Sequence, residues 1–401
     1  MTDNKGIPKD NYRIQYIASC IGIAFFGVAF LALGAIMPLI TEEYGLSDRM
    51  SATLAAVLPV GTLAGSLVFG PVIDRRGYKL IMIISNLIGA AALLLMALTG
   101  SFSILVAGVA ALGVSGGLIN GTTNALASDV STDSNRDRNI MFLGLFYCLG
   151  AIATTYSIPM LSGKVSYNAI LIGAAVLMAA ASLFYTAITF PGAKESNSKA
   201  GTNILELLKQ PTLLIFSFVL FFQGAIEGIT NNRISQYLIE IEDFTTTDAG
   251  FALSFVLIGL AIGRLCAGFI LKHLGRPAII ASGMAVALAG IAILTYSKNI
   301  GALLNAAPGK IAIAGTLLIG FGITSTVPIV LGVLGGIYKE MSGTVFSIAI
   351  SICLIGNSIL NYTLGLLGIG AFPIMIGVCM IMIIILFTIG SKKYMNNINN
   401  F

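Results

Sequence analysis

The sequence predicts an all-α integral membrane protein with twelve transmembrane helices in two parallel six-helix halves. Composition, the spacing of apolar stretches and an internal repeat lead to this fold class. Hydrophobic residues make up 57% of the chain and charged residues only 10%, and the mean hydropathy is +0.95. A soluble domain has about 25% charged residues. This chain therefore has too little polar surface to stay dissolved without a membrane.

The charged and turn-forming residues divide the sequence into twelve apolar stretches. About 20 helical residues cross the hydrocarbon core of a bilayer, so each stretch is long enough to span it. Polar positions do not alternate along the stretches as they would in barrel strands, and this favours helices. The expected spans are 14–40, 51–73, 80–100, 102–128, 139–162, 168–190, 212–239, 250–271, 278–296, 310–337, 343–367 and 371–390.

Four glycines recur at a fixed offset of 198 residues, which is close to half the chain length. The two sets are Gly61, Gly65, Gly70 and Gly77, and Gly259, Gly263, Gly268 and Gly275. The period is too long for a solenoid or a propeller and is typical of a transporter built from two parallel repeats. We therefore expect an N-terminal half over 1–190, a cytoplasmic linker over 191–211 and a C-terminal half over 212–401. Within the linker, NILELLKQ is compatible with a short helix on the membrane surface or with a plain connector.

The distribution of lysine and arginine predicts that both termini are cytoplasmic. Sixteen of these residues fall in segments on that side, four fall in outer loops, and Arg233 and Arg264 lie within spans. Positive residues concentrate on the cytoplasmic side of membrane proteins. The net charge of +5 is thus explained by orientation and contact with anionic lipid, and not by nucleic-acid binding. No cleavage site stands out, so the first stretch is expected to be helix 1 of a protein of the cytoplasmic membrane, in bacteria the cell inner membrane.

The sequence contains few of the residues that catalysis or metal binding requires. The five cysteines all fall within spans, and the single histidine, His273, lies in a cytoplasmic turn. Buried cysteines act as small hydrophobic residues in most proteins. We expect no enzyme activity, no metal site and no cofactor.

The first glycine set ends in the motif Gly70-x3-Asp74-Arg75-x-Gly77-x-Lys79. This motif resembles the signature between helices 2 and 3 of the major facilitator superfamily, although Tyr78 stands where a basic residue is usual. The second copy, Gly268-x3-Lys272-His273-x-Gly275-Arg276, has lost the acid. The resemblance implies the major facilitator fold and a transport function, and it does not identify the substrate.

The motif residues Gly70, Asp74, Arg75, Gly77 and Lys79 are expected to form a gate at the cytoplasmic surface. Gly70 would let helix 2 pack closely against a neighbour, and Gly77 would permit a tight turn. Asp74 would accept bonds from the amides of a helix N-terminus or pair with a basic side chain. Such a latch would favour the outward-open state. In the alternative, the basic residues of the motif serve only to fix topology.

A second acid, Asp129, closes helix 4 on the same side as the motif. It precedes Arg136 and Arg138 closely in the sequence. A local charge network among these three residues is expected.

A finer resemblance is carried by residues 221–238 (FFQGAIEGITNNRISQYL), 259–270 (GLAIGRLCAGFI) and 116–130 (GGLINGTTNALASDV). These stretches are similar to helices 7, 8 and 4 of the fucose permease branch, and the likeness implies sugar:proton symport. Asn120 stands where that branch has its proton-carrying glutamate, and helix 1 contains no acid. Coupling would therefore have to use another carboxylate.

Glu227 is the acid expected near the middle of span 7. An ionisable group at this depth costs about 2.5–3.5 kcal/mol, so it indicates function by default. It would bind substrate, carry a proton or do both, or it would form a structural ion pair with Arg264. Arg264 would in turn receive an anionic group or hold helix 8 against helix 7. The run from Thr230 through Asn231 to Asn232 suggests a local unwinding of helix 7.

Neutral polar residues recur about one helical turn apart in three other spans. The asparagines among them are Asn120 and Asn124 in span 4 and Asn357 and Asn361 in span 11. Neutral donors and acceptors beside aromatic faces suit a hydroxylated solute such as a sugar. Hydrogen bonds between helices would explain the same residues without a ligand.

These observations favour a monomeric secondary active transporter that moves a small solute by alternating access. The solute is expected to be a sugar or sugar derivative, with protons as the coupling partner, membrane lipids as surroundings and no nucleic-acid partner. Proton-driven efflux of drugs or other amphiphiles is the alternative, although residues 150–163 do not match the helix 5 motif of drug–proton antiporters. A non-transporting membrane sensor is a third option. Substrate identity, direction of transport and coupling ion stay open.

Overall fold

The computed structural model describes residues 9–161, 165–193, 204–271 and 273–398. Helices are the only regular secondary structure in these ranges. By their contacts the residues form two compact units. The first comprises residues 1–139, 143–201 and 335–348, and the second comprises 140–142, 202–334 and 349–401. The predicted division into six-helix halves at 190 and 212 stays a prediction.

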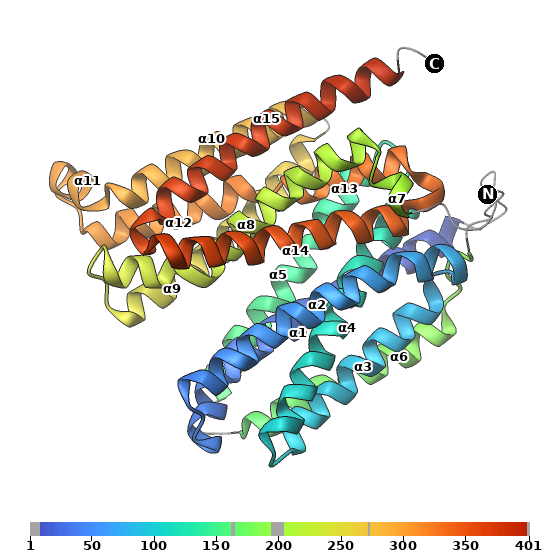
Figure 1. Cartoon of the computed structure of the whole chain (residues 1–401), viewed down its shortest axis with the longest axis horizontal. Coiled ribbons are helices and arrows are strands. Elements are labelled where there is room, and N and C mark those ends of the chain that lie inside the picture. Colours follow the sequence, from blue (N-terminus) through green and yellow to red (C-terminus); the bar gives the residue numbers. More distant parts are fainter. Residues whose placement is uncertain (1–8, 162–164, 194–203, 272, 399–401) are drawn as a thin grey trace. The chain divides into compact units, whose positions relative to one another are not determined.

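Six long helices account for most of the first unit (Figure 1). They are α1 (Lys9–Tyr44), α2 (Asp48–Arg76), α3 (Tyr78–Leu98), α4 (Phe102–Asp129), α5 (Arg136–Leu161) and α6 (Tyr167–Ala187). Helix α4 is the centre of the packing, because α1, α2 and α3 all lie against it, and α6 covers α3.

The second unit contains most of the remaining helices. They are α7 (Ile204–Leu207), α8 (Pro211–Glu240), α9 (Thr246–Ile270), α10 (Arg276–Thr295), α11 (Ser297–Leu304), α12 (Pro308–Ile323), α13 (Thr326–Ile337), α14 (Ser342–Leu367) and α15 (Phe372–Ile398), with the 3₁₀ turn η2 (Ile369–Ala371). The 3₁₀ turn η1 (Lys339–Met341) and the end of α13 from residue 335 belong to the first unit. Helix α12 packs against α9 and α10, and α8 packs against α9 and α15. The start of α14, up to residue 348, belongs to the first unit.

Eleven helical segments among the described residues are long and apolar enough to cross a membrane. Together they cover eleven of the twelve predicted stretches, with α12 and α13 forming a single segment, Pro308–Ile337. The remaining stretch, 139–162, falls on α5, of which the side chains of residues 155–161 lie outside the described part. The prediction of an all-helical membrane protein is confirmed.

The repeated glycines mark equivalent close packings in the two units. A Cβ atom added at Gly61 or Gly65 would meet the backbone of α4 at Ala110 or Val114. In the second unit, a Cβ at Gly259 or Gly263 would meet the backbone of α12 in the same way. Helices approach this closely only where small residues line the contact. The duplication seen in the sequence is therefore a duplication of a helix pair, α2 with α4 and α9 with α12.

The later glycines of the two sets differ from each other. Gly77 has φ +78°, a conformation that favours glycine, and a Cβ there would come within 3.0 Å of Pro191 and Gly192. Its counterpart Gly275 has φ −67°, and a Cβ there would make only an ordinary contact, with Pro277 Cδ at 3.8 Å. Only the first copy therefore needs a glycine for its turn. Lys272, which replaces the acid in the second copy, lies outside the described residues.

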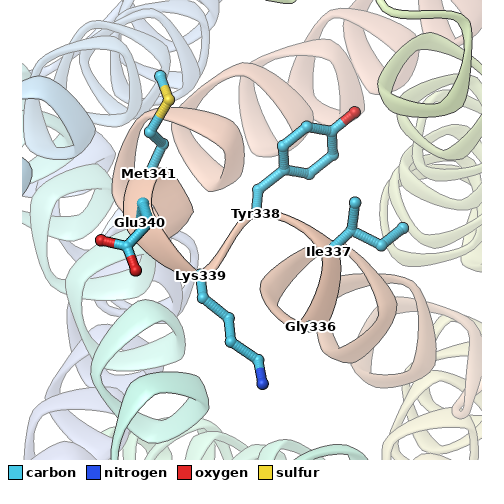
Figure 2. A pocket seen from close by; sticks show the side chains of 6 residues that line it. All are labelled: Gly336, Ile337, Tyr338, Lys339, Glu340 and Met341. Atoms are coloured by element: carbon cyan, nitrogen blue, oxygen red, sulfur yellow. The ribbon is translucent and has the colours of Figure 1, made fainter. Parts of the chain in front are cut away.

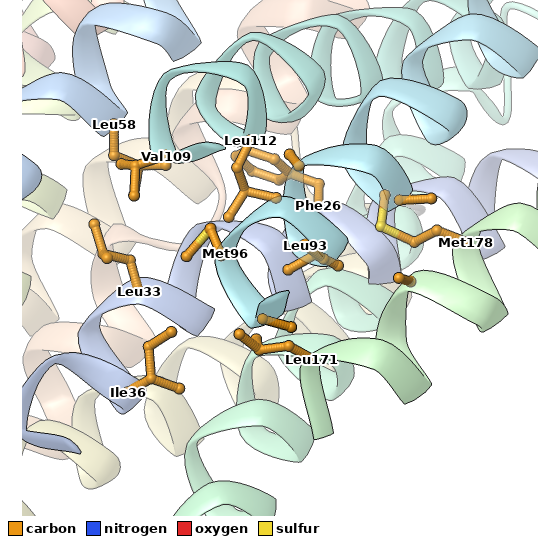
Figure 3. Close-up of a cluster of buried hydrophobic side chains, with 14 of the residues drawn as sticks. Phe26, Leu33, Ile36, Leu58, Leu93, Met96, Val109, Leu112, Leu171 and Met178 are labelled. Atoms are coloured by element: carbon orange, nitrogen blue, oxygen red, sulfur yellow. The ribbon is translucent and has the colours of Figure 1, made fainter. Parts of the chain in front are cut away.

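The core of the first unit is an apolar cluster that joins six helices, with Leu143 as the contribution of α5; part of it is drawn in Figure 3. It includes Phe26, Leu33 and Ile36 of α1, Leu58 of α2, Leu93 and Met96 of α3, Val109 and Leu112 of α4, and Leu171 and Met178 of α6. These residues contain no polar side-chain atoms that require a partner. The cluster holds the unit rigid, so that the polar groups at the ends of its helices keep fixed positions.

Two local predictions of helix geometry differ from the structure. The expected unwinding at 230–232 was wrong, because α8 continues without interruption from Pro211 to Glu240. The break instead separates α12 from α13 at Thr324 and Ser325. Pro328 explains it, because proline has no N–H to bond the carbonyl of residue 324 and its ring clashes with that carbonyl. A single turn of helix, α7, forms within the predicted linker, whose residues 194–203 are not described.

Candidate functional site

Glu227 lies midway along α8 and is half-buried. The Nε2 atom of Gln223, one turn earlier on the same helix, donates a hydrogen bond of 2.9 Å to Glu227 Oε1. Side chains four residues apart on a helix face the same side, which explains the pairing. Among the described residues no other donor to this carboxylate is found. Glu227 thus retains capacity to accept hydrogen bonds.

The same Gln223 nitrogen donates a second hydrogen bond of 2.9 Å to the backbone carbonyl of Ile323. Ile323 is the last residue of α12, directly before the break at Thr324. The hydroxyl of Thr324 donates to the carbonyl of Leu260 on α9 at 2.9 Å. The break between α12 and α13 is therefore hydrogen-bonded to α8 and to α9. Gln223 connects it to Glu227, because the same nitrogen bonds both groups.

Arg264 on α9 is the cation that belongs to this site. Its side chain is buried, with 8% exposed, and its charge acts on the Glu227 carboxylate. The sequence is compatible with an ion pair between Glu227 and Arg264 or with a substrate contact for each of them. Both residues belong to the second unit, and Arg264 acts electrostatically on the Glu227 carboxylate.

Asn357 on α14 packs against α8 at Gly228, the residue after Glu227. A Cβ added to Gly228 would collide with the Asn357 carboxamide. Asn361 Nδ2 donates to the Asn357 carbonyl at 3.0 Å and to Asn357 Oδ1 at 2.6 Å. Glycine at position 228 makes room for a pair of amides beside the acid. The acid, the cation and the two amides therefore belong to the same unit, with the amides packed against the residue that follows the acid.

The other predicted binding residues lie elsewhere. Asn120 and Asn124 are half-buried on α4 of the first unit, where Asn124 Nδ2 donates to the Asn120 carbonyl at 2.8 Å and to Asn120 Oδ1 at 3.1 Å. They form a pair of the same kind as Asn357 and Asn361. Asn231 is half-buried on α8, one turn beyond Glu227. Arg233, expected to face away from Glu227, donates to Gln236 at 3.0 Å.

The motif acid Asp74 accepts three hydrogen bonds from the first turn of α14. The donors are the Gly343 amide at 3.2 Å, the Thr344 amide at 2.7 Å and the Thr344 hydroxyl at 2.7 Å. A carboxylate at a helix N-terminus satisfies amides that have no partner within the helix and complements the helix dipole. Helix N-terminal amides, one of the two kinds of partner considered from the sequence, are therefore present at Asp74.

Glycines allow this approach of α2 to α14. A Cβ on Gly343 would come within 2.6 Å of Asp74 Oδ1, and a Cβ on Gly70 would meet the Gly343 carbonyl. Among the basic residues of the motif, Lys79 donates to the carbonyl of Thr186 at 2.7 Å, and Arg75 is exposed. Asp74, Gly70 and Gly343 therefore form one closely packed contact, which we call the Asp74 clamp.

Tyr78, which stands in place of a basic residue, has a defined partner. It is 1% exposed, and its hydroxyl donates to Asp129 Oδ2 at 2.6 Å. The other carboxylate oxygen of Asp129 accepts from the Ser342 hydroxyl at 2.8 Å. Asp129 thus links the start of α3 to the start of α14. A neutral hydroxyl occupies the place where the family pattern has a charge.

A third acid, Asp133, lies in the exposed loop between α4 and α5. It pairs with Lys339 at 2.9 Å and with Arg136 at 2.9 Å. The hydrogen bond from Lys339, together with Arg136, lowers the pKa of Asp133 below its ordinary value. The charge network expected around Arg136 therefore includes Asp133, a residue that the sequence analysis did not single out.

The turn that carries Lys339 also lines a pocket of about 250 Å³ between α13 and α14. Its walls come from residues 336–341, and the side chains of Tyr338 and Lys339 point in opposite directions (Figure 2). The pocket is formed by one short segment only. It does not include any of the predicted binding residues.

Sequence reasoning missed Gln223, Ile323, Thr344 and Ser342. Gln223 stands four residues before Glu227, and this spacing was a usable signal. Pro328 was a signal for the break after Ile323. Contacts of Thr344 and Ser342 with acids more than 200 residues away leave no local trace in the sequence. No group of three or more His, Cys, Asp or Glu side chains that could hold a metal occurs in the described part of the chain.

Comparison with known proteins gives one family and a consistent fold. The family profile of the Major Facilitator Superfamily matches residues 18–361. An uncharacterized MFS-type transporter of Yersinia pestis is 22% identical over 309 residues, which are 77% of each chain. The multidrug resistance protein MdtG of Yersinia enterocolitica is 26% identical over 221 residues, or 52% of each chain.

Among solved structures, the transporter FucP in its outward conformation superposes on this chain with a TM-score of 0.78 at 16% sequence identity. The superposition covers 95% of this chain and 99% of FucP. FucP is the Escherichia coli fucose:proton symporter. The proton:xylose symporter XylE gives a TM-score of 0.78 at 12% identity and covers 96% of each chain. At these identities the likeness shows the fold, and the predicted major facilitator fold is confirmed. A family match over most of the chain, with helices that span a membrane, identifies this protein as a multi-pass membrane transporter that belongs to the Major Facilitator Superfamily.

Proposed function

We propose that this transporter moves a sugar or sugar derivative across the cytoplasmic membrane by alternating access, coupled to protons. The observation that carries the proposal is the half-buried Glu227 on a membrane-spanning helix, beside amide side chains and a buried arginine. Acid and amide groups within an apolar helix bundle suit a ligand with several hydroxyl groups. The solved structures with the same fold include symporters of fucose and xylose, which supports this substrate class.

In this proposal Glu227 is both the proton carrier and a substrate contact. An acid within a membrane helix is costly and is retained where it pairs or works. Only Gln223 donates a hydrogen bond to it among the described residues, so it keeps capacity for a proton or a ligand hydroxyl. Asn120 occupies the place of the glutamate expected from the resemblance, which leaves Glu227 as the carboxylate for coupling.

The remaining binding groups are proposed to be Asn357, Asn361 and Asn231 with Arg264, and Asn120 with Asn124. In each pair the later asparagine donates to the carboxamide oxygen of the earlier one. The earlier asparagine, Asn120 or Asn357, would offer its own N–H groups to a ligand. Arg264 would hold the acid in its charged form until a proton arrives.

The Asp74 clamp is proposed as the gate. Its hydrogen bonds join the end of α2 to the first turn of α14, near the surface predicted to be cytoplasmic. We propose that the clamp stabilises the outward-open state and opens when the halves 1–190 and 212–401 rock during transport. Both termini would be cytoplasmic, and the protein would work as a monomer among membrane lipids.

Efflux of drugs or other amphiphiles is the second candidate. The similarity to the multidrug resistance protein MdtG over about half of each chain favours it. In that case Glu227 would exchange a proton for a cationic substrate, and no polyhydroxylated ligand would bind.

A thermal-shift screen of the purified protein against sugars, uronates and amphiphilic drugs separates the two candidates. A ligand present at 100 times its dissociation constant stabilises the folded protein by about 2.7 kcal/mol, which is easily measured. We expect stabilisation by a sugar or uronate, lost in Glu227→Gln and kept in Glu240→Gln, an exposed acid on the same helix. Stabilisation by amphiphilic drugs alone would overturn the sugar proposal in favour of efflux.

A further inference from the structure

Gln223 makes two hydrogen bonds with one nitrogen atom. Its Nε2 donates to Glu227 Oε1 and to the carbonyl of Ile323, each at 2.9 Å. The side chain is fully buried. Both N–H bonds of the carboxamide are therefore occupied, one by the acid and one by the backbone at the break between α12 and α13.

The Ile323 carbonyl determines which end of the carboxamide faces Glu227. A backbone carbonyl can only accept a hydrogen bond, so the end of Gln223 beside it must be the NH₂ group. The same NH₂ group faces Glu227 Oε1, and this oxygen is thereby held as an acceptor. The flipped amide would direct its oxygen at two acceptors, Ile323 and an ionised Glu227, and would lose both bonds.

This orientation has a cost at the other end of the amide. Gln223 Oε1 is buried and has no hydrogen-bond donor among the described residues. An unsatisfied buried acceptor destabilises the folded state. The two hydrogen bonds made by Gln223 Nε2 offset the cost of the unsatisfied Oε1. One of these two bonds holds the Glu227 carboxylate in place.

Arg264 of α9 acts electrostatically on Glu227, and the charge of Glu227 acts in turn on the Cys353 thiol of α14. Asn357, also on α14, is neutral. The hydrogen bond that the structure records at Oε1 comes from Gln223, so this oxygen is the one whose role is fixed.

We propose that Gln223 is a positioning residue that keeps Glu227 Oε1 as a permanent acceptor, so that the proton and the substrate are taken at Oε2. The inference rests on the proposed function of Glu227 as the working carboxylate. It specifies which oxygen of Glu227 takes the proton. It also links the protonation of Glu227 to the break between α12 and α13, because Gln223 bonds both. Loss of the Gln223 donor makes Oε1 available for protonation and disfavours the carboxylate form.

The test uses dicyclohexylcarbodiimide, which adds to protonated carboxyl groups in apolar surroundings. The purified full chain is labelled over a range of pH, and the modified peptide is quantified by mass spectrometry. Glu227→Gln gives the background. In Gln223→Met, which keeps the size of the side chain without its donor, we expect the midpoint pH of labelling at Glu227 to rise by about one unit. Gln223→Asn, one methylene shorter, should shift the midpoint in the same direction.

The chain offers a matched control on the same helix. Gln236 Nε2 donates to Glu240 Oε1 at 2.8 Å, with the same four-residue spacing, at an exposed position. Gln236→Met should leave the midpoint at Glu227 unchanged. An unchanged midpoint in Gln223→Met would overturn the proposal, even if that variant melted at a lower temperature. Labelling needs no substrate, so a normal transport rate in Glu227→Gln would overturn the proposed function while the shift at Glu227 still supported the positioning role.

Discussion

Asp74 and Glu227 are both acids on membrane-spanning helices, and their surroundings differ sharply. Asp74 receives three hydrogen bonds from Gly343 and Thr344, two of them from amides at the start of a helix. Among the described residues, Glu227 receives one hydrogen bond, from a side chain on its own helix. A carboxylate that already accepts several hydrogen bonds has little capacity left for a further partner, whereas one that accepts a single bond can still take a proton or a ligand. The difference is the reason for proposing that Asp74 acts as a clamp and Glu227 as the working carboxylate.

If Asp74 is a clamp, Asp74→Asn should change the rate of transport more than the affinity for substrate. Asparagine offers one acceptor oxygen to three donors and removes the charge at the helix N-terminus. Hydrogen bonds to charged groups contribute about 1.5–3 kcal/mol, which corresponds to a loss of roughly 10-fold or more in rate. The measurement is initial uptake of the radiolabelled ligand found in the screen, together with its dissociation constant. Equal transport rates would remove the clamp from the account.

Gly343→Ala should weaken the clamp without removing the acid. The added Cβ would lie 2.6 Å from Asp74 Oδ1, which is closer than such atoms approach, so the carboxylate must shift. We expect a fall in rate of about 3-fold, because some of the three hydrogen bonds can re-form at longer distances. Gly192→Ala is the control, because nothing lies within 4 Å of a Cβ at that position. A rate equal to that of the control would show that the close packing is irrelevant to transport.

Tyr78→Phe tests the second acid at the clamp, Asp129. It removes the hydroxyl that donates at 2.6 Å and leaves the Ser342 bond in place. Loss of one donor to a partly buried carboxylate costs about 1–3 kcal/mol of stability, so the melting temperature should fall by a few degrees. Tyr296→Phe, at an exposed tyrosine, should melt like the wild type. An unchanged melting temperature in Tyr78→Phe would mean that Asp129 does not join α3 to α14 in any energetic sense.

The smallest effect is expected at Asp133, whose side chain is 68% exposed. Lys339 and Arg136 lower the pKa of this carboxyl in the folded state. Its contribution to the free energy of unfolding is therefore fully present at a pH above the ordinary pKa of about 4, and it is lost as the pH falls through the lowered pKa. Exposed pairs contribute under about 1 kcal/mol. Asp133→Asn should melt slightly below the wild type at neutral pH, and the difference should vanish in acid. A difference that persists in strong acid would contradict this assignment.

The sequence was sufficient for the fold because its signals are periodic and local. Apolar stretches of spanning length gave the positions of the helices, and the repeated glycines indicated the close packing of α2 on α4 and α9 on α12. The same signals located Glu227 and Asp74, since an acid in an apolar segment or in a turn motif stands out. They could not locate Gly343 and Thr344, because these residues meet Asp74 only after the chain has folded. The expected unwinding of α8 failed because polar residues are tolerated in a continuous helix, whereas Pro328 imposes a break.

The most direct test is proton-driven accumulation of substrate in membrane vesicles. Wild-type protein and Glu227→Gln are compared at equal expression, with Glu240→Gln as a folded control that alters an exposed acid of α8. We expect the wild type and the control to accumulate substrate when a proton gradient is imposed, and we expect Glu227→Gln not to do so although it melts at the wild-type temperature. Accumulation by Glu227→Gln at the wild-type level would show that Glu227 is not the carboxylate that couples protons to transport.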